Sequence, residues 1–362
     1  MELFEKFEIF INSIKKDDNL AIFYHTSCVD GLCSCVITSK AITKLTGIKP
    51  LFHIPHLHEL NNDTLEFIKK NEIKKVIYID LIPDRYPEVV KEAEKYAELL
   101  IIDHHKFKTN LDSKKTLLLH AEYINSKLDG AQYPASKLTY DIFLKLTDLE
   151  DLDWLACVGL IGDSGYSTWK EFVLEVINRH NLEQESNLFN GSDFGKCAAL
   201  LSGATMYGGN SDLLFDIVYK SENFKDILQN KILIGYDAES KAELRKWILR
   251  TNEAEIYGDL VIFEIKPKLK INSTLSTVLS FEQFKDKTLI IIMDYFNDGF
   301  LTISARDQRK KIKLNELLNE AVADLPESSS GGHIPAAGAT IRKEDKDKFK
   351  KKLIQLYNNL NK

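Results

Sequence analysis

The sequence has few cysteines and no long apolar segment. Five of its 362 residues are Cys, an odd number, and most lie in apolar or glycine-rich surroundings, which argues against the disulfide framework of a secreted protein. No apolar run approaches the roughly 18 residues that a membrane-spanning helix requires. Residues 1–19 have the pattern of an amphipathic helix and lack the apolar core of a signal peptide. We therefore expect a cytoplasmic protein, in a reducing compartment, with no membrane partner.

The composition is that of a folded protein with more than one domain. Hydrophobic residues make up 44% and charged residues 28% of the chain, the usual balance of globular proteins, and its length suits two or three domains. The net charge of −6 argues against a general nucleic-acid coat. Residues 1–254 carry 30 basic and 39 acidic residues, whereas residues 255–362 carry 18 and 15. Either this is ordinary surface variation, or it indicates a metal site in the first part and a phosphate-bearing ligand held by the second.

The N-terminal part alternates apolar strands with helical segments. The expected strands consist of near-continuous Ile, Leu, Val and Tyr residues and lie at 20–25, 49–54, 75–80 and 99–105, with helices at about 31–45, 60–70 and 88–97. Buried strands separated by helices are typical of a parallel sheet that is covered on both faces. We therefore predict an α/β fold, in which ligands bind beyond the carboxyl ends of the strands.

The rest of the chain is expected to form a helical connector and a second, smaller α/β domain. Residues 134–253 have a mostly helical pattern, with a buried helix at 153–165 and a long connecting helix at 238–251. Strands return at about 255 in the segments DLVIFEI, TLIIIMDY and FLTISAR, and a basic helix follows at about 343–360. No internal repeat is found, and only the Ser-Gly run at 328–332 has a biased composition.

Histidines and aspartates follow the predicted strands at the edge where ligands bind. They are His25 and Asp30 after the first strand, Asp80 after the third and His104 after the fourth, joined by Asp163 in the buried helical segment. A lone Asp at such a position is usually a helix cap or a loop residue, but five such groups are harder to explain in that way. Mixed imidazole and carboxylate ligands suit Mn²⁺ or a similar ion better than a structural Zn²⁺. A shared carboxylate would allow two ions about 4 Å apart, which suits phosphoester hydrolysis.

Other histidines and basic residues favour ordinary roles. His53, His56 and His58 follow the second strand without matching Cys or carboxylate ligands, so we expect them in a substrate cleft or at the surface, with a zinc site as the alternative. The basic segments 306–313 and 346–357 are expected to be solvated faces. Non-specific attraction for a phosphodiester backbone is the alternative for these two segments.

Four segments together resemble the DHH phosphoesterase superfamily with its DHH-associated C-terminal domain. They are Asp80 after VIYI, the tripeptide Asp103-His104-His105 after LLII, Asp163 in GLIGDSG, and GGHIPAAGA at 331–339. The tripeptide alone would be a weak signal, but the order and spacing of the four segments make the combination specific. The resemblance spans nearly the whole chain. Members of this superfamily include RecJ-like exonucleases, nanoRNases, cyclic-dinucleotide phosphodiesterases and family II inorganic pyrophosphatases.

The resemblance implies a set of metal ligands in the N-terminal part. Asp30 would bind one metal ion, and Asp80 would bridge two ions. His104 and Asp163 would be further ligands of the ion that Asp30 binds. The implied cofactor is Mn²⁺, as one or two ions, with Mg²⁺ or another divalent ion as the alternative.

It also implies a catalytic role for the rest of the tripeptide. Asp103 would orient His104, and His105 would donate to the substrate phosphate or to its leaving oxygen. Under the resemblance, the chain would divide into a DHH metal-binding catalytic domain (1–190), a helical extension and connector (191–254) and a DHH-associated substrate-binding domain (255–362).

Substrate-binding residues are implied in the C-terminal part. Arg306, in the segment TISAR, would grip a phosphate or a terminal nucleotide. Gly331 and Gly332 would let the backbone approach the ligand, and His333 would face a phosphate. The active site is expected in a cleft between the two α/β domains.

The first motif departs from the pattern of most members. It reads HTSCVDG from His25 to Gly31, so that Cys28 stands where most members have Asp. A minority branch with H-x-x-C-x-D-G looks similar. We place His25 and Cys28 in the predicted ligand set, although a small buried residue at a strand end is an equal alternative for Cys28. A thiolate is a softer ligand than a carboxylate, so Cys28 could favour a different ion or weaken the second metal site.

Together these features predict a metal-dependent phosphodiesterase that hydrolyses single-stranded nucleic acid or short oligonucleotides from an end. One alternative is a small-nucleotide or cyclic-dinucleotide phosphohydrolase. The alternative outside enzymes is a nucleic-acid-binding scaffold that has lost the chemistry. The prediction leaves open a homodimer and a protein partner in replication or repair.

Overall fold

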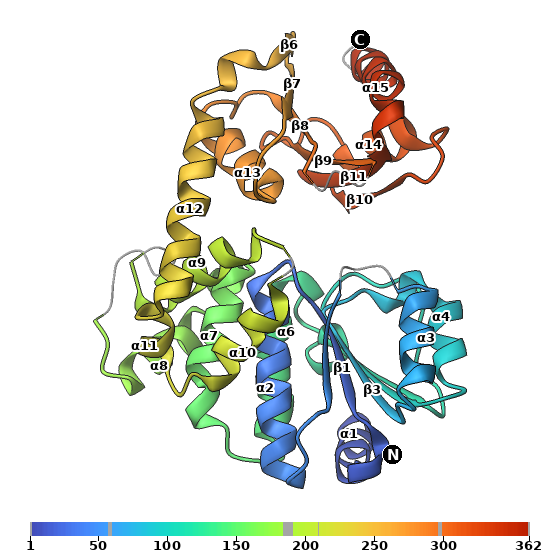
Figure 1. Cartoon of the computed structure of the whole chain (residues 1–362), viewed down its shortest axis with the longest axis vertical. Coiled ribbons are helices and arrows are strands. Elements are labelled where there is room, and N and C mark those ends of the chain that lie inside the picture. The colour runs from blue at the N-terminus through green and yellow to red at the C-terminus, as the bar shows by residue number, and fades with distance from the viewer. Residues whose placement is uncertain (1, 57–59, 184–190, 209, 296–298, 361–362) are drawn as a thin grey trace. The chain divides into compact units, whose positions relative to one another are not determined.

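The computed structural model describes residues 2–56, 60–183, 191–208, 210–295 and 299–360. The chain divides into two compact units, residues 1–237 and residues 238–362 (Figure 1). This division does not test the three functional parts expected from the sequence, which stay a prediction. Among the described residues, no helix is both long enough and apolar enough to cross a membrane.

The first unit is built on a five-stranded parallel sheet with the strand order β2-β1-β3-β4-β5. Its strands are β1 (Ala21–His25), β2 (Phe52–His56), β3 (Lys75–Ile79), β4 (Glu98–Asp103) and β5 (Thr116–His120). The inner strands are buried along nearly their whole length, as expected where helices cover both faces of a sheet. The predicted α/β fold with a parallel sheet is therefore confirmed. The strand β5 was not predicted.

Helices cover both faces of this sheet. The helices of the first unit are α1 (Leu3–Asn12), α2 (Val29–Thr46), α3 (Asn62–Lys70), α4 (Pro87–Ala93), α5 (Ala121–Ile124), α6 (Ala135–Leu144), α7 (Asp153–Gly162), α8 (Lys170–Arg179), α9 (Asp193–Thr205), α10 (Ser211–Lys220) and α11 (Phe224–Leu228), of which α8, α9 and α11 pack on other helices. One core contains Ile77 of β3 with residues of α2, α6 and α7, and the other contains Tyr78 with residues of α3 and α4. Figure 1 shows α2 on one side of β1 and β3, with α3 and α4 on the other. Successive residues of a strand point to opposite faces, which is why neighbours such as these enter different cores.

The second unit contains a six-stranded mixed sheet with the order β10-β11-β9-β8-β7-β6. Its strands are β6 (Glu255–Tyr257), β7 (Leu260–Ile265), β8 (Thr288–Met293), β9 (Phe300–Arg306), β10 (Ser329–His333) and β11 (Ala336–Arg342), and its helices are α13 (Asn272–Glu282), α14 (Leu314–Val322) and α15 (Lys346–Leu360). The helix α12 (Lys231–Ile248) runs across the boundary between the two units. Apolar residues of α14 and α15 form a core with Ile290 and Ile292 of β8, and α13 contacts β8 and β9.

The glycine-rich segment after α14 forms a β-hairpin rather than an irregular run. Gly331 pairs with Gly338, and β11 continues the sheet onto β9. At Gly332 the backbone has φ of +128°, and a Cβ atom there would lie 2.6 Å from the Ala336 carbonyl oxygen. Only glycine adopts this conformation without strain. The composition bias of this segment therefore reflects a close approach of two strands.

Candidate metal centre

Three adjacent strands of the first unit deliver ionisable residues to one edge of the sheet. His25 ends β1, Asp80 follows β3, and Asp103 ends β4, directly before His104 and His105. Because β3 lies between β1 and β4 in a parallel sheet, their carboxyl ends meet at one edge. Three of these five side chains, those of Asp80, Asp103 and His104, are no more than 5% exposed. The order of the strands in the sheet thus brings side chains of the kinds that bind metal ions together at one edge.

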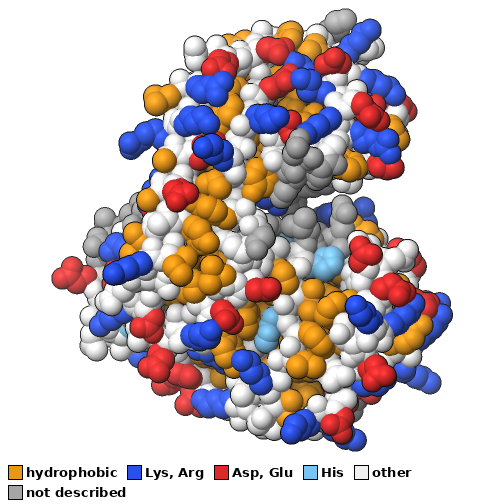
Figure 2. All heavy atoms as spheres, viewed as in Figure 1, with side chains coloured by type: hydrophobic (Ala, Val, Ile, Leu, Met, Phe, Trp, Pro, Cys, Tyr) orange, Lys and Arg blue, Asp and Glu red, His pale blue; other side chains and the backbone are white. Residues whose placement is uncertain are grey.

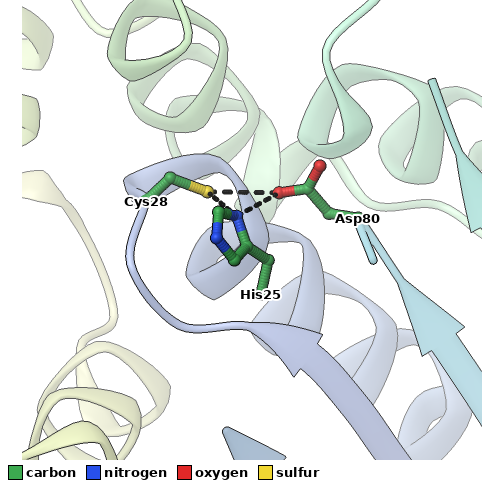
Figure 3. A group of neighbouring side chains, drawn as sticks. All are labelled: His25, Cys28 and Asp80. Atoms are coloured by element: carbon green, nitrogen blue, oxygen red, sulfur yellow. Dashed lines mark hydrogen bonds and ion pairs between the residues drawn. The ribbon is translucent and has the colours of Figure 1, made fainter. Parts of the chain in front are cut away.

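The carboxylate of Asp80 lies at the centre of this group. Its Oδ2 is 3.1 Å from the Cys28 Sγ and 3.4 Å from the His25 Nδ1. Figure 3 shows these three side chains pointing toward one another. Its Oδ1 is 3.2 Å from the His104 Nε2 and 3.5 Å from the His105 Nδ1. The Oδ1 atom is buried and makes no hydrogen bond of good geometry to the described residues. Each oxygen of one carboxylate therefore faces a different group of potential ligands.

A left-handed turn and a second aspartate hold Asp80 in this position. Asp80 and Ile82 have φ of +62° and +52°, values that L-residues rarely adopt. The Asp103 Oδ2 accepts hydrogen bonds from the backbone N–H groups of Leu81 and Ile82, at 3.1 and 2.7 Å. Those bonds compensate the cost of the turn and fix the direction of the Asp80 side chain.

The other oxygen of Asp103 contacts His105 rather than His104, the partner that had been predicted. Asp103 was expected to orient His104, but its Oδ1 accepts from the backbone N–H of His105 at 2.8 Å and lies 2.9 Å from the His105 Nδ1. The physical reason is that the Asp103 side chain closes a short turn onto the backbone N–H of His105, two residues further on, which places the His105 ring beside the carboxylate. Asp103 thus positions His105 and the turn at Asp80.

A second group of potential ligands consists of Asp30, His104 and Asp163. One ligand atom from each of these residues lies within 4.8 Å of the others. The carboxylate of Asp30 accepts from the backbone N–H groups of Ala135 at 2.7 Å and Ser136 at 3.0 Å, which begin α6. These free N–H groups of a helix start favour a negative charge. Asp163 follows α7 and lies with its Oδ2 4.0 Å from the His104 Nε2.

Glycine at position 31 allows this close packing. A Cβ atom on Gly31 would collide with the carbonyl oxygen of His25. The first turn of α2 can therefore sit against the end of β1, which brings Asp30 and Cys28 toward the strand ends. This gives a structural reason for the Asp-Gly pair in the motif.

Burial and like charges perturb the protonation of both groups. Burial by itself would raise the pKa of Asp80, but the imidazoles of His104, His25 and His105 hold it well below its usual range. Burial opposes protonation of His104, yet the carboxylates of Asp80, Asp163 and Asp30 raise its pKa to about 10. Burial and the neighbouring Asp30 raise the pKa of Asp163 to about 7. The same carboxylates that favour a proton on His104 would attract a metal ion, and the ion would displace that proton when the imidazole becomes a ligand.

Cys28 contacts His25 and Asp80 from its position at the start of α2. It is the N-cap residue of this helix, and its Sγ accepts a hydrogen bond from the backbone N–H of Gly31 at 3.2 Å. The Sγ also lies 3.1 Å from the His25 Nδ1. Burial, followed by the nearby carboxylates of Asp80 and Asp30, raises the pKa of the Cys28 thiol well above its usual range. As a thiol, it donates to the Asp80 Oδ2.

The donor set fits divalent metal ions. Among the described residues, three groups could hold an ion: His25 with Cys28 and Asp80, Asp80 with His104 and His105, and Asp30 with His104 and Asp163. The orphaned, buried Oδ1 of Asp80 between two imidazoles is the kind of acceptor that a cation satisfies. All six residues of the predicted metal-ligand set occur in these groups. Their individual roles as ligands stay a prediction.

One residue near the centre was missed by the sequence reasoning. The Ser27 Oγ lies 2.6 Å from the His25 Nε2, so this hydroxyl orients the ring and its Nδ1 faces Cys28 and Asp80. Residues that orient a ligand in this way are a regular feature of metal sites. The polar residues Thr26 and Ser27, which lie between two predicted ligands, could have indicated a side chain that orients His25.

The predicted substrate-binding residues belong to the second unit. Arg306 ends β9 opposite Ala336 of β11, and its guanidinium donates to the Ala305 carbonyl at 3.0 Å and to the Ser273 Oγ at 3.2 Å. Burial lowers the pKa of Arg306, and no described carboxylate forms an ion pair with it. Gly331 and Gly332 lie in β10. His333 ends that strand, and its side chain lies outside the part of the chain that the structure describes.

Several other basic residues of the second unit form ion pairs with acids. Lys346 and Lys350 of α15 pair with Glu264 at 2.8 and 2.6 Å. Arg309 pairs with Asp307 at 3.0 Å. Figure 2 shows Lys and Arg side chains interspersed with Asp and Glu on the visible face. These pairs favour the solvated-face interpretation of the two basic segments.

The histidines of the second strand have structural contacts. The ring of His53 stacks on Phe215 of α10, with centroids 3.9 Å apart, and its Nε2 lies 2.9 Å from the Ser39 Oγ. The His56 Nε2 lies 3.1 Å from the Thr64 Oγ1. Neither residue occurs in the metal-ligand groups found among the described residues, and His58 lies outside those residues.

Comparisons with known proteins concern the fold of the chain and the C-terminal part of its second unit. Residues 266–359 match the family model of the DHHA1 domain. The exonuclease RecJ bound to manganese matches with a TM-score of 0.70 and 16% identity, over 98% of this chain and 94% of that one. RecJ from Thermus thermophilus in complex with Mn²⁺ matches with a TM-score of 0.71 and 15% identity, over 98% and 54%. CDC45 from Entamoeba histolytica matches with a TM-score of 0.55 and 12% identity, over 98% of both chains. No curated protein matches the chain.

The chain therefore shares the fold of the RecJ and CDC45 structures, and residues 266–359 of its second unit match the DHHA1 domain. The resemblance drawn from the sequence motifs is confirmed. At these identities the likeness to solved structures concerns the fold, and the chemistry must be argued from the residues of this chain.

Proposed function

We propose that the protein is a metal-dependent phosphodiesterase that hydrolyses single-stranded nucleic acid or short oligonucleotides from an end. The observation that carries this proposal is the Asp80 carboxylate, whose two oxygens face two different ligand groups. This is the arrangement that a bridging ligand of a two-ion site requires. Exonuclease RecJ, which has the same fold, was solved with manganese, and Mn²⁺ is the ion we propose, with Mg²⁺ as the alternative.

Within this proposal, the residues of the first unit have separate tasks. Divalent ions bound there would supply Lewis acidity for the phosphate and lower the pKa of a water molecule. His25, Cys28 and Asp80 hold one position, and Asp30, His104 and Asp163 hold the other, with Asp80 facing both. Asp103 fixes the turn that presents Asp80. These residues keep the ligand atoms within a few ångströms before substrate arrives, which reduces the reorganisation that the reaction needs.

His105 is the proposed proton donor to the leaving oxygen. Burial opposes its protonation, but Asp103 contacts its Nδ1 and raises the pKa of His105. A histidine kept protonated by a fixed carboxylate can act as a general acid at neutral pH. Phosphodiester cleavage needs such a group because the leaving alkoxide is a strong base.

The second unit supplies the proposed grip on substrate. Arg306 is a partly buried cation that contacts a hydroxyl and a carbonyl instead of a carboxylate. Such a guanidinium can bind a phosphate with two parallel hydrogen bonds. The glycine pair at 331–332 would let a phosphate approach the backbone. Binding of one terminal phosphate favours cleavage at an end over cleavage within a long duplex.

One observation favours a rival outside enzymes. Cys28 replaces the usual Asp of the first motif, and a chain that lost one metal site could persist as a nucleic-acid-binding scaffold. The clustering of Asp30, Asp80, His104 and Asp163 speaks against this loss, because several carboxylates gathered around one imidazole repel one another unless a cation lies between them.

A substrate panel tests the proposal. The purified chain is incubated with end-labelled short RNA, short DNA, cyclic dinucleotides and pyrophosphate, in Mn²⁺, in Mg²⁺ or in chelator. We expect a ladder of shortened oligonucleotides in Mn²⁺ and none in chelator. Cleavage of the cyclic dinucleotide alone would instead support the small-nucleotide alternative. Binding of oligonucleotide without any cleavage would support the scaffold.

A further inference from the structure

We propose that the His25–Cys28–Asp80 group is a thiolate metal site that prefers a softer ion, such as Zn²⁺, Co²⁺ or Fe²⁺, whereas the Asp30–His104–Asp163 group prefers Mn²⁺ or Mg²⁺. The inference rests on the proposed function, because it concerns the ions of the same centre. It gives the protein two unlike metal positions that share Asp80.

The geometry of the first group suits a small tetrahedral ion. The Cys28 Sγ lies 3.1 Å from the His25 Nδ1 and 3.1 Å from the Asp80 Oδ2, and the latter two atoms are 3.4 Å apart (Figure 3). Ligand bonds of about 2.0 to 2.3 Å at tetrahedral angles separate ligand atoms by roughly 3.3 to 3.7 Å. The three atoms are therefore close to a ligating arrangement and need to move by only a few tenths of an ångström.

Two neighbouring groups prepare this site for a metal ion. The Ser27 Oγ lies 2.6 Å from the His25 Nε2, which leaves the ring oriented with its Nδ1 toward Cys28. The backbone N–H of Gly31 donates to the Cys28 Sγ at the start of an 18-residue helix. This hydrogen bond lowers the pKa of the Cys28 thiol, but burial and the carboxylates of Asp80 and Asp30 raise it by more, so the sulfur is a thiol until a metal ion binds. On metal binding the thiol proton leaves to solvent, and the sulfur becomes a ligand.

A purely structural role, as the N-cap of α2 or as a small buried residue, accounts poorly for a cysteine at position 28. An N-cap position favours Ser, Thr, Asp or Asn, whose oxygen is a better acceptor than sulfur. The other four cysteines are buried, whereas Cys28 is partly exposed. Cys33 and Cys35, on the same helix, belong to the apolar core. The Cys28 sulfur is thus the one cysteine sulfur that lies among ligand-type side chains of the described residues, where it can coordinate a soft ion.

The two groups differ in the hardness of their donors. The first offers one thiolate, one imidazole and the shared carboxylate, a mixture that selects zinc-like ions. The second offers two carboxylates of its own and one imidazole, which suit Mn²⁺ or Mg²⁺. Three protein ligands in the first group leave a coordination position for water or substrate, as in catalytic zinc sites.

Cobalt substitution tests the inference by a readout other than activity. The full chain is stripped with chelator and titrated with Co²⁺ under anaerobic conditions, while the near-ultraviolet absorption from thiolate to cobalt is recorded. We expect this band in the parent, in the Cys35→Ala control and in the Asp163→Asn variant, which weakens only the second group. The band should be absent from Cys28→Ser, although that variant still binds Co²⁺ at the second group.

Metal competition gives an independent measurement. With one molar equivalent of Zn²⁺ and an excess of Mn²⁺, elemental analysis should find about one of each ion per parent chain, because Mn²⁺ binds N, O and S ligands more weakly than Zn²⁺. Cys28→Asp should bind Mn²⁺ at both positions, and circular dichroism melts show whether this variant is folded. A parent without the absorption band, or a band that persists in Cys28→Ser, would overturn the inference. If hydrolysis in Mn²⁺ survives that result, the proposed function stands, and if the band appears without any hydrolysis, the proposed function fails instead.

Discussion

At the scale of single residues, the centre depends most on Asp80. Its two oxygens face the two ligand groups, so no other side chain can replace it. Asp80→Asn keeps the shape of the side chain and removes its charge. We expect this variant to lose hydrolysis by at least a hundredfold and to lose most of its bound metal. Elemental analysis and the oligonucleotide assay measure both effects, and full activity in Asp80→Asn would rule out a shared carboxylate.

Arg306 should act on substrate rather than on metal. Arg306→Ala removes a charge-assisted contact worth about 1.5 to 3 kcal/mol, so kcat/KM on oligonucleotides should fall by tens-fold while metal content is unchanged. A small generic phosphodiester should be affected far less.

Arg309→Ala is the matched control for this arginine. Arg309 pairs with Asp307 and Asp259, so its loss should lower the melting temperature and leave kcat/KM nearly unchanged. Equal losses on the oligonucleotide and on the small ester in Arg306→Ala would show that Arg306 is structural.

At the scale of secondary-structure elements, the turn after β3 depends on Asp103. Asp103→Asn replaces one carboxylate oxygen by an NH₂ group, which cannot accept hydrogen bonds from the backbone N–H groups of Leu81 and Ile82. Each buried N–H group left without an acceptor lowers the free energy of unfolding by about 1 to 3 kcal/mol. We expect a lower melting temperature together with a 10- to 100-fold weaker metal affinity. Calorimetric titration with Mn²⁺ measures the affinity.

Asp84→Asn is the control for this turn. Asp84 also accepts from two backbone N–H groups, those of Lys108 and Thr109, but it belongs to none of the ligand groups. It should lose stability without losing metal affinity. If both variants bound Mn²⁺ as the parent does, Asp103 would have no role in presenting Asp80.

His53 of β2, which stacks on Phe215 of α10, should make the free energy of unfolding depend on pH. Burial lowers the pKa of His53 to about 4, whereas an unfolded His titrates near 6.5. Between these values the unfolded chain binds a proton that the folded chain does not, so stability is fully present above about pH 6.5 and falls as the pH drops toward 4. The loss from this group is at most about 3 kcal/mol.

Denaturant unfolding of His53→Phe at several pH values checks this expectation. The variant keeps an aromatic ring against Phe215 and loses the titration, so its stability should fall less between pH 6.5 and 4 than that of the parent. Ser39→Ala is the control, because it also loses the hydrogen bond between His53 and Ser39 but keeps the His53 imidazole. Its free energy of unfolding should depend on pH as that of the parent does. Identical slopes in the parent and in His53→Phe would contradict the assignment.

Elements also show what the sequence could and could not predict. The strands β1, β3, β4 and β8 were evident because each is an unbroken apolar run. The strands β10 and β11 were missed, since a segment of Ser, Gly and Ala has no apolar pattern and becomes a hairpin only by pairing with β9. Within the centre, the clustering of strand-end residues could be predicted from topology. The contact of Asp103 with His105 and with the turn depends on positive φ values, which no residue pattern at Asp80 or Ile82 indicates.

At the scale of the whole molecule, each unit has its own apolar core. Because the proposed ligands all belong to the first unit, Mn²⁺ should stabilise that unit by RT ln(1 + [Mn²⁺]/Kd), about 2.7 kcal/mol at a hundredfold excess over Kd. Amide hydrogen exchange should therefore slow in β3 and β4 on addition of Mn²⁺, with no change in β8 and β9. Equal protection of both units would contradict a metal centre confined to the first.

The central claim is that a two-position metal centre built around Asp80 hydrolyses phosphodiesters. The most direct test measures hydrolysis of an end-labelled short oligonucleotide while metal is returned to chelator-stripped protein, with bound ions per chain counted at each step. We predict that the rate of hydrolysis rises as the number of bound metal ions approaches two per parent chain. Asp80→Asn should not bind two ions and should not become active. Hydrolysis in the stripped protein, or equal hydrolysis by Asp80→Asn, would contradict the account.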